Sequence, residues 1–179
     1  SPRHLYDAAF ELFSCQKPVV AAIQGAAVGG GLGVACFADF RVAAPEARFT
    51  ANFARLGFHH GFGLTVSLPG LVGQQKALEL LYTGRRINGS EAVAIGLADE
   101  LADLESLRGA AHSRAAEIAA SAPLAVESIR MTMRGHLPGA IKVATDREKE
   151  EQDRLRRSSD WTEGVNAMNE RRSPNFTRE

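Results

Sequence analysis

The segment GAAVGGGLGV, residues 25–34, follows the apolar run PVVAAIQ (18–24) and contains five glycines in ten positions. Each glycine inside a helix or strand lowers stability by roughly 0.5–1 kcal/mol relative to alanine, so this density needs a reason. Two nucleotide-binding patterns do not match this segment. The dinucleotide fingerprint GxGxxG matches Gly29 and Gly31 but meets Val34 at its third glycine, and a phosphate-binding loop would need lysine where Gly31 stands.

The glycine segment is best explained as the place where a predicted strand enters the first turn of a helix through small residues. Backbone N–H groups in such a turn are unpaired, and the helix dipole is positive there. The turn can therefore bind an anion or stabilise a developing oxyanion. The glycines could instead serve only to let a helix and a strand pack closely, and the motif alone leaves both interpretations open.

Composition and charge restrict the function. The 179 residues are 45% hydrophobic, which is enough for one domain with a sizeable core. A formal net charge of zero argues against nucleic acid or an anionic membrane as partner. No apolar run approaches the ~20 residues that cross a bilayer. Cys15 and Cys36 lack metal-binding spacing and predict buried, reduced thiols, so we expect a cytoplasmic protein without a metal site.

Strand and helix patterns alternate in the first part of the chain, and helices dominate from residue 104 onward. Strands are predicted at 18–24, 40–44, 47–51 and 98–102. Helices are predicted within 3–16, 32–38, 61–73, 74–84, 89–97, 104–121, 123–135, 140–157 and 160–172. Ser90 is the predicted N-cap of the fifth helix, with Gly96 at its end. This order predicts an α/β fold with a helical C-terminal region.

Together with two later stretches of the chain, the glycine segment resembles the crotonase (enoyl-CoA hydratase/isomerase) superfamily. The matching stretches are KPVVAAIQGAAVGGGLGVACFADFRVAAPEARF (17–49), LGFHHGFGLTVSLPGLVGQQKALELLYTGRRINGSEAVAIGLADEL (56–101) and EGVNAMNERRSPNF (163–176). The resemblance implies a spiral core of stacked ββα units over residues 1–104. It also implies a helical trimerisation region over residues 105–179, which forms a homo-trimer or a dimer of trimers.

The resemblance implies an acyl-CoA substrate, with coenzyme A as part of that substrate and no other cofactor. Family members stabilise a thioester enolate with two backbone N–H groups, and Gly30 matches one of these donors. The second donor belongs to an earlier segment in the family. We therefore expect about 80 further N-terminal residues in the functional protein, because losing one oxyanion donor lowers the rate roughly 10²–10³-fold.

The acid–base groups of the hydratases are not found at their expected positions. Two glutamates of the family match Gly33 and Phe53, neither of which can move a proton. Other branches carry an aspartate that aligns with Gly61 or His60. His59 and His60 titrate near neutrality and suit proton abstraction beside a thioester, so we expect His60, or else His59, to handle the proton. Alternatively, one of them faces solvent or caps the next helix.

The resemblance also implies contacts with coenzyme A. Met168 and Arg171 match a Phe and a Lys that contact coenzyme A of the neighbouring subunit in hydratases, and they keep an apolar contact and an attraction for phosphate. The expected substrate contacts are Gly29, Gly33, Phe53, Leu56, Gly57, Met168 and Arg171. Asp39 is expected to be structural. The segment 146–157 is expected to be a solvated or subunit-facing helix with Glu150/Arg154 and Asp153/Arg157 pairs.

The sequence thus predicts an acyl-CoA-processing enzyme that acts through an oxyanion-stabilised thioester enolate. Isomerisation, C–C hydrolysis and decarboxylation are favoured over standard hydration. The alternatives are a non-catalytic acyl-CoA-binding protein and a hydratase that uses other groups. RNA binding, known for some members of the family, would need a basic patch that this sequence lacks.

Overall fold

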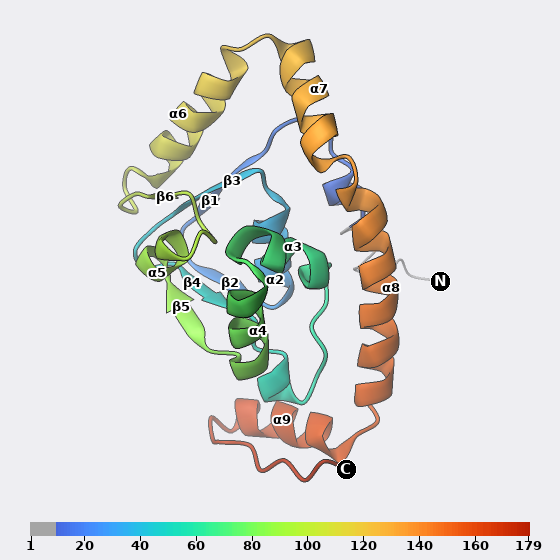
Figure 1. The fold of residues 1–179 in the computed structure, drawn as a ribbon. Helices are drawn as coiled ribbons and strands as arrows, with labels where there is room; N and C mark the ends of the chain where they lie inside the picture. Colours follow the sequence, from blue (N-terminus) through green and yellow to red (C-terminus); the bar gives the residue numbers. More distant parts are fainter. Residues whose placement is uncertain (1–9) are drawn as a thin grey trace.

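The strands of the computed structural model, which describes residues 10–179, form two three-stranded sheets (Figure 1). One sheet has the order β1-β3-β6, with bounds Val20–Ile23, Phe40–Ala43 and Glu100–Leu101. The other has the order β2-β4-β5, with bounds Ala26–Val28, Arg48–Thr50 and Arg86–Asn88. Neighbouring strands are parallel except for β4 and β5. The pairs β1–β2 and β3–β4 each place one strand in either sheet before a helical segment, so the predicted α/β class with stacked ββα units is confirmed.

Short helices cover the sheets and supply most of the core. They are α2 (Gly30–Phe37), the 3₁₀ helix η1 (Ala54–Leu56), α3 (Leu64–Val72), α4 (Gln74–Thr83) and α5 (Gly89–Ala94). The main hydrophobic cluster joins side chains from both sheets and these helices, including Leu32, Phe49 and Leu68. The prediction of Ser90 as N-cap was wrong, because the Asn88 side chain accepts the Glu91 N–H and the helix begins two residues earlier, at Gly89.

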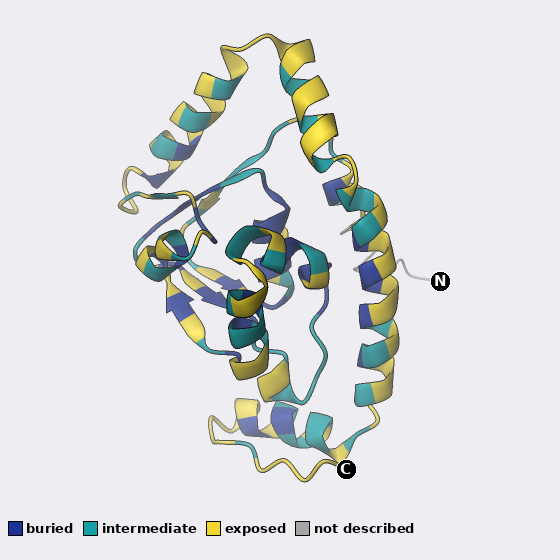
Figure 2. Ribbon diagram, viewed as in Figure 1, coloured by how far each residue is buried: buried dark blue, intermediate teal, exposed yellow. Residues whose placement is uncertain are grey.

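Four longer helices complete the chain and form a frame around the core (Figure 1). They are α6 (Leu107–Ala119), α7 (Pro123–Arg134), α8 (Leu137–Leu155) and α9 (Ser159–Asn169). Along α8 the buried residues face the core, whereas α7 has no buried residue (Figure 2). None of the helices in the described part combines the length and hydropathy needed to cross a bilayer.

Ion pairs attach α7 to the core. The Asp39 carboxylate, directly after α2, accepts the Val19 N–H at 2.8 Å. It also pairs with Arg130 at 3.0 Å and Arg134 at 3.3 Å, both on α7. Burial lowers the pKa of Arg134, and the nearby Asp39 opposes this shift. Asp39 therefore has the structural role expected of it.

The two cysteines differ in burial. Cys36 is buried on α2, and burial raises the pKa of its thiol to about 12, so it is unreactive. Cys15 is only half-buried, which corrects the expectation that both are buried. Residues 10–13 are helical as predicted, while Leu5 and Ala9 of the predicted amphipathic helix lie outside the described residues.

Gly33 is required by the packing of α2 against Phe62. An ideal Cβ on Gly33 would lie 2.6 Å from Cδ1 and 2.7 Å from Cβ of Phe62, closer than real side-chain contacts. Phe62 is 2% exposed and adopts a φ of 60°, a left-handed conformation that is rare for a bulky residue. The backbone and the ring are thus held in place by their surroundings, and neither can easily move aside for a larger residue at position 33.

We predict that Gly33→Ala lowers the free energy of unfolding by about 1–3 kcal/mol, the usual effect of overpacking a core. Gly31→Ala is the matched control on the same helix, because an ideal Cβ there meets nothing within 4 Å. Alanine at position 31 is expected to stabilise by about 0.4–1 kcal/mol. Chemical denaturation of both variants measures the difference, and equal stabilities would contradict this description of the packing.

Candidate active site

The glycine segment places two open N–H groups at the start of α2. Gly29 has a φ of 56°, and its N–H donates to the Thr50 carbonyl of β4 at 3.0 Å. The N–H groups of Gly30 and Gly31 have no hydrogen-bond partner within the described residues. An ideal Cβ on either glycine meets nothing within 4 Å, so the space on that side of the backbone is free. Unpaired N–H groups at the start of a helix are able to donate to an anion.

The histidine loop, residues 57–63, connects η1 to α3 and carries both candidate proton carriers. The rings of His59 and His60 stack with centroids 4.2 Å apart and planes 27° apart. Nδ1 of His59 lies 2.7 Å from the His60 carbonyl oxygen, and Nε2 of His60 lies 2.8 Å from Oγ1 of Thr65 on α3. Both imidazoles are therefore fixed by hydrogen bonds, and neither is a mobile surface side chain.

Helix α8 holds the histidine loop from outside the core. The carboxylate of Glu148, which is fully buried, accepts hydrogen bonds from Gly63 N at 2.8 Å, Thr65 N at 3.1 Å and Thr65 Oγ1 at 2.6 Å. It thereby caps the start of α3, which has no side-chain cap of its own. The Gln152 side chain donates to the His59 carbonyl at 2.9 Å, one helical turn further along α8.

The expectation that segment 146–157 is a solvated or subunit-facing helix was wrong for these two residues. A sequence signal for them existed, because Ile141, Ala144, Glu148 and Gln152 share one helical face with apolar residues at its start. The predicted pairs Glu150/Arg154 and Asp153/Arg157 were also wrong. The outward face instead pairs Arg147 with Glu151 at 2.7 Å, Arg154 with Glu151 at 2.6 Å and Arg156 with Asp153 at 3.7 Å.

Burial controls the charge of His60. Desolvation, with a smaller contribution from His59, lowers the pKa of His60 from 6.5 to about 4. Glu148 Oε1 lies 3.9 Å from Nε2 of His60, but the Thr65 hydroxyl already binds both groups. His60 is therefore neutral at physiological pH and can accept a proton but has none to spare as an acid.

The two histidines line a cavity of about 390 Å³, here called the histidine cavity. Its walls include Phe53, Phe58, His59, His60, Thr65 and Tyr82. The ring of Phe53 connects this cavity to the glycine segment, because its Cζ lies 3.6 Å from an ideal Cβ on Gly29. Phe53 therefore lies beside Gly29 and also lines the cavity that contains the imidazoles.

A second cavity of about 520 Å³, here called the arginine groove, lies on the other side of η1. Its walls include Thr50, Arg55, Leu56, Arg86, Met168 and Arg171. Arg172 also lines it, and its hydrogen bonds lower the pKa of Glu163 to about 2. The guanidinium groups of Arg86 and Arg171 have no carboxylate partner within residues 10–179. The groove is thus cationic and open to an anionic ligand.

Helix α9 brings Met168 and Arg171 to the groove of their own chain. It packs closely against η1, since a Cβ on Gly164 would lie 2.5 Å from the Leu56 backbone. The rings of Phe58 and Trp161 add a contact at 4.4 Å. The resemblance implied contact with the coenzyme A of a neighbouring subunit. Within their own chain both residues line the groove beside Val28 of β2 and Thr50 of β4, and the contact across a subunit boundary stays a prediction.

The predicted site residues thus fall into two groups. Phe53, His59 and His60 line the histidine cavity, whereas Leu56, Met168 and Arg171 line the arginine groove. Gly33 is buried behind Phe62, and Gly57 faces the Asp160 backbone of α9, so neither lines a described cavity. Sequence reasoning missed Thr65, Glu148 and Gln152, as well as Arg86 and Arg172 of the groove.

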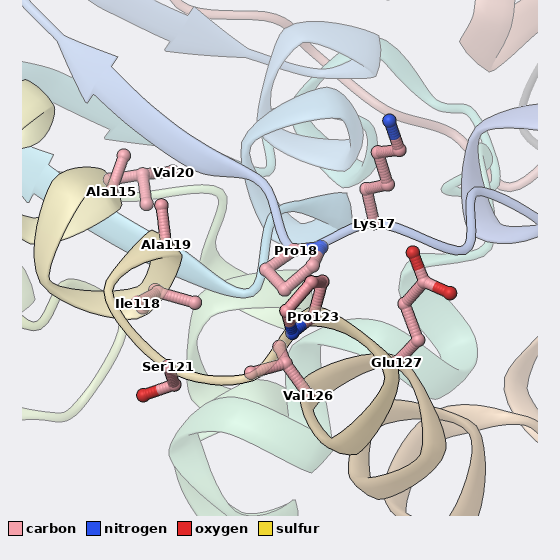
Figure 3. A pocket seen from close by; sticks show the side chains of 10 residues that line it. All are labelled: Lys17, Pro18, Val20, Ala115, Ile118, Ala119, Ser121, Pro123, Val126 and Glu127. Carbon is pink, nitrogen blue, oxygen red and sulfur yellow. The ribbon is translucent and has the colours of Figure 1, made fainter.

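A third cavity lies apart from both groups, between the turn joining α6 to α7 and the residues before β1 (Figure 3). It has a volume of about 310 Å³ and mainly apolar walls, with Lys17 and Glu127 as its charged side chains. Among the described residues, its walls include no cysteine or histidine. Within residues 10–179, no three His, Cys, Asp or Glu side chains gather as a metal site would require.

We predict that stability falls as the pH drops from about 6.5 to about 4, because the unfolded chain binds a proton at His60 more readily than the folded one. The loss is at most about 3 kcal/mol and levels off below pH 4. His60→Gln keeps an N–H donor for Thr65, and it should flatten the dependence of stability on pH over this range. Denaturation at a series of pH values measures both proteins, and an NMR titration midpoint of His60 near 6.5 would contradict the prediction.

Comparison with known proteins agrees with this architecture. The model of the family described as enoyl-CoA hydratase/isomerase matches residues 2–179. A crotonyl-CoA hydratase of Syntrophomonas wolfei is 37% identical over 161 residues, which are 90% of this chain and 62% of that protein. A carnitinyl-CoA dehydratase of Proteus mirabilis is 35% identical over 170 residues, which are 93% and 65% of the two chains. The chain spans about three fifths of the length of the curated relatives it matches.

Solved structures show the same fold. An enoyl-CoA hydratase/isomerase from Pseudoalteromonas atlantica superimposes with a TM-score of 0.87 at 28% identity, covering 94% of this chain and 68% of the other. A carnitinyl-CoA hydratase from Mycobacterium avium superimposes with a TM-score of 0.84 at 30% identity, covering 92% of this chain and 64% of the other. From its sequence match along nearly the whole chain and from its fold, the chain belongs to the enoyl-CoA hydratase/isomerase family, within the crotonase superfamily.

Proposed function

We propose that the protein processes an acyl-CoA through a thioester enolate stabilised at Gly30. The observation that carries this proposal is the pair of unpaired N–H groups at Gly30 and Gly31, in open space at the start of α2. A thioester oxygen that gains negative charge would accept a hydrogen bond from Gly30 and interact favourably with the helix dipole. The second donor would come from a further N-terminal segment of the whole protein.

In the proposed step, His60 is the base. Its unshared nitrogen pair takes a proton from the carbon next to the thioester carbonyl, the C–H electrons move into the enolate, and the oxygen carries the negative charge. Return of the same proton to another carbon gives an isomer, and no outside acid is needed. His59, stacked on His60, is the second candidate for this role.

The proposed reaction is isomerisation, C–C hydrolysis or decarboxylation in preference to standard hydration. The relatives are named hydratases and dehydratases, but Gly33 and Phe53 replace both hydratase glutamates. The contact between Gly33 and Phe62 supports this choice, because a glutamate at position 33 would need the space that the ring fills. A hydratase that relies on other groups remains the alternative closest to the relatives' names.

A non-catalytic acyl-CoA binder is the second candidate. The observation that favours it is the pKa of His60, because a base whose pKa is about 4 removes carbon-bound protons inefficiently. The fixed hydrogen bonds of both imidazoles favour the enzyme, because binding an apolar acyl chain would not require them.

The arginine groove is the proposed site for the phosphates of coenzyme A. Arg86 and Arg171 offer two uncompensated cations, and Met168 adds an apolar surface, 53% exposed, beside them. We also propose that the exposed apolar residues of α7, such as Leu124 and Ile129, contact other subunits in a homo-trimer or a dimer of trimers. The zero net charge and the fold are consistent with a cytoplasmic enzyme without affinity for nucleic acid or membranes.

Incubation of the full-length protein with a panel of acyl-CoAs, including enoyl and cyclic β-keto thioesters, tests the reaction. Mass spectrometry of the products should show an isomer, a ring opening or loss of carbon dioxide, and His60→Ala should lose most of that turnover. Addition of water to a simple enoyl-CoA would contradict the proposal that the enzyme does not carry out standard hydration. Full turnover in His60→Ala would remove His60 from the mechanism. Binding of acyl-CoA by the wild type without turnover would identify a non-catalytic acyl-CoA-binding protein.

We predict that Arg171→Met weakens the binding of coenzyme A roughly 10–100-fold, the effect of losing a hydrogen bond between charged groups. Arg147→Met, on the outer face of α8, is the control and should leave the affinity unchanged, because Arg147 pairs with Glu150 and Glu151 away from the groove. Calorimetric titration with coenzyme A alone measures both. Equal affinities in the two variants would place the phosphates elsewhere.

A further inference from the structure

We infer that Thr65 and Glu148 are positioning residues that fix His60 as its Nε2–H tautomer, so that Nδ1 is the atom left to accept a proton. The inference deepens the proposed function and rests on it for the role of His60 in the reaction. Its structural part rests on one chain of hydrogen bonds, which runs from α8 through α3 to the histidine loop. Neither residue is a catalytic residue, because both act through His60.

The direction of this chain follows from counting protons. A carboxylate only accepts hydrogen bonds, so the contact of 2.6 Å between Thr65 Oγ1 and Glu148 Oε1 uses the single hydroxyl proton of Thr65. The hydroxyl oxygen can then only accept from His60, whose Nε2 lies 2.8 Å away. Nε2 must therefore carry the hydrogen in the neutral ring, and Nδ1 must carry the free electron pair.

Glu148 is held firmly enough to impose this direction. Its carboxylate is fully buried and also accepts the backbone N–H groups of Gly63 and Thr65, at 2.8 and 3.1 Å. These two bonds come from the backbone at the start of α3, so they do not depend on any side-chain rotation. A carboxylate fixed by two amides leaves the Thr65 hydroxyl one strong acceptor and hence one orientation.

His59 is fixed in the opposite tautomer. Its Nδ1 lies 2.7 Å from the His60 carbonyl oxygen, which cannot donate, so Nδ1 carries the hydrogen. Two stacked imidazoles thus expose different nitrogens, Nε2 on His59 and Nδ1 on His60. Neither exposed nitrogen has a hydrogen-bond partner within the described residues, and both rings line the histidine cavity.

The charged groups around His59 and His60 do not reverse the assignment of their tautomers. Glu148 lies 3.9 Å from Nε2 of His60, Glu151 of α8 interacts electrostatically with His59, and hydrogen bonding from Arg154 lowers the pKa of Glu151. When Nδ1 of His60 takes a proton, Nε2–H continues to donate to Thr65. Glu148 then lies 3.9 Å from a positive ring, so the same residue that sets the tautomer also stabilises the imidazolium.

Long-range ¹H–¹⁵N correlation of full-length protein labelled with ¹⁵N-histidine, at neutral pH, reads each tautomer directly. His60→Gln assigns the His60 signals by their loss. The wild type should show the Nε2–H pattern for His60 and the Nδ1–H pattern for His59. Thr65→Val should give mixed tautomers for His60, Thr65→Ser should restore the wild-type pattern, and Glu148→Gln should broaden the distribution because the acceptor is no longer a carboxylate.

Ser67→Ala is the matched control for folding. Ser67 is buried on the same helix and donates to the Gly63 carbonyl at 3.0 Å, but its hydroxyl lies outside the chain to His60. This variant should keep both tautomers. Where a preferred acyl-CoA is known, kcat should fall roughly 10–100-fold in Thr65→Val, as when groups that orient a functional imidazole are removed, and Thr65→Ser should recover it.

An Nδ1–H pattern for His60 in the wild type, or an unchanged pattern in Thr65→Val, would overturn the inference. The spectra need no substrate, so they separate this inference from the proposed function. A protein that shows the expected tautomers but processes no acyl-CoA would contradict the proposed function alone. A protein that turns over an acyl-CoA with His60 in the other tautomer would contradict this inference alone.

Discussion

The buried carboxylate of Glu148 at the start of α3 is the interaction on which the arrangement of the site depends. A buried charge is tolerated when its hydrogen-bonding capacity is satisfied, and here two backbone amides and the Thr65 hydroxyl satisfy it. The same contacts join α8 to the core, replace the missing side-chain cap of α3 and orient His60. One residue of the C-terminal helical frame therefore determines the conformation of the loop that carries the proposed chemistry.

The packing around Gly33 connects the fold to the choice of reaction. Phe62 follows the two histidines in the loop, and its ring lies against Gly33 of α2. A loop residue thus takes the space beside the position where a hydratase carries a glutamate. Gly33, Phe62 and the two histidines thus belong to one packed unit, and in the proposed function the proton carrier lies on this loop while Gly30 supplies the open N–H group.

Local sequence patterns predicted the regular elements well but not the contacts between distant ones. The glycine segment, the apolar run 18–24 and the helical periods after residue 104 are local signals, and the elements they predicted are present. The strands β2 and β5 were missed for local reasons: β2 lies inside the glycine segment, which reads as a turn, and β5 has a single apolar residue, Ile87, between two polar ones. Of the site, Gly30, His59 and His60 were candidates from the sequence. Glu148 was not, because a glutamate in a highly charged segment looks solvated until the helix is packed against α3.

A crystal structure of the full-length protein with a bound CoA thioester would test the central claim most directly. The thioester oxygen should lie about 2.7–3.1 Å from the Gly30 nitrogen, the geometry of an oxyanion hole. Nδ1 of His60 should face the carbon next to that carbonyl, and the phosphates should lie in the arginine groove. A thioester bound away from Gly30, or an acyl group remote from both histidines, would contradict the assignment of this site.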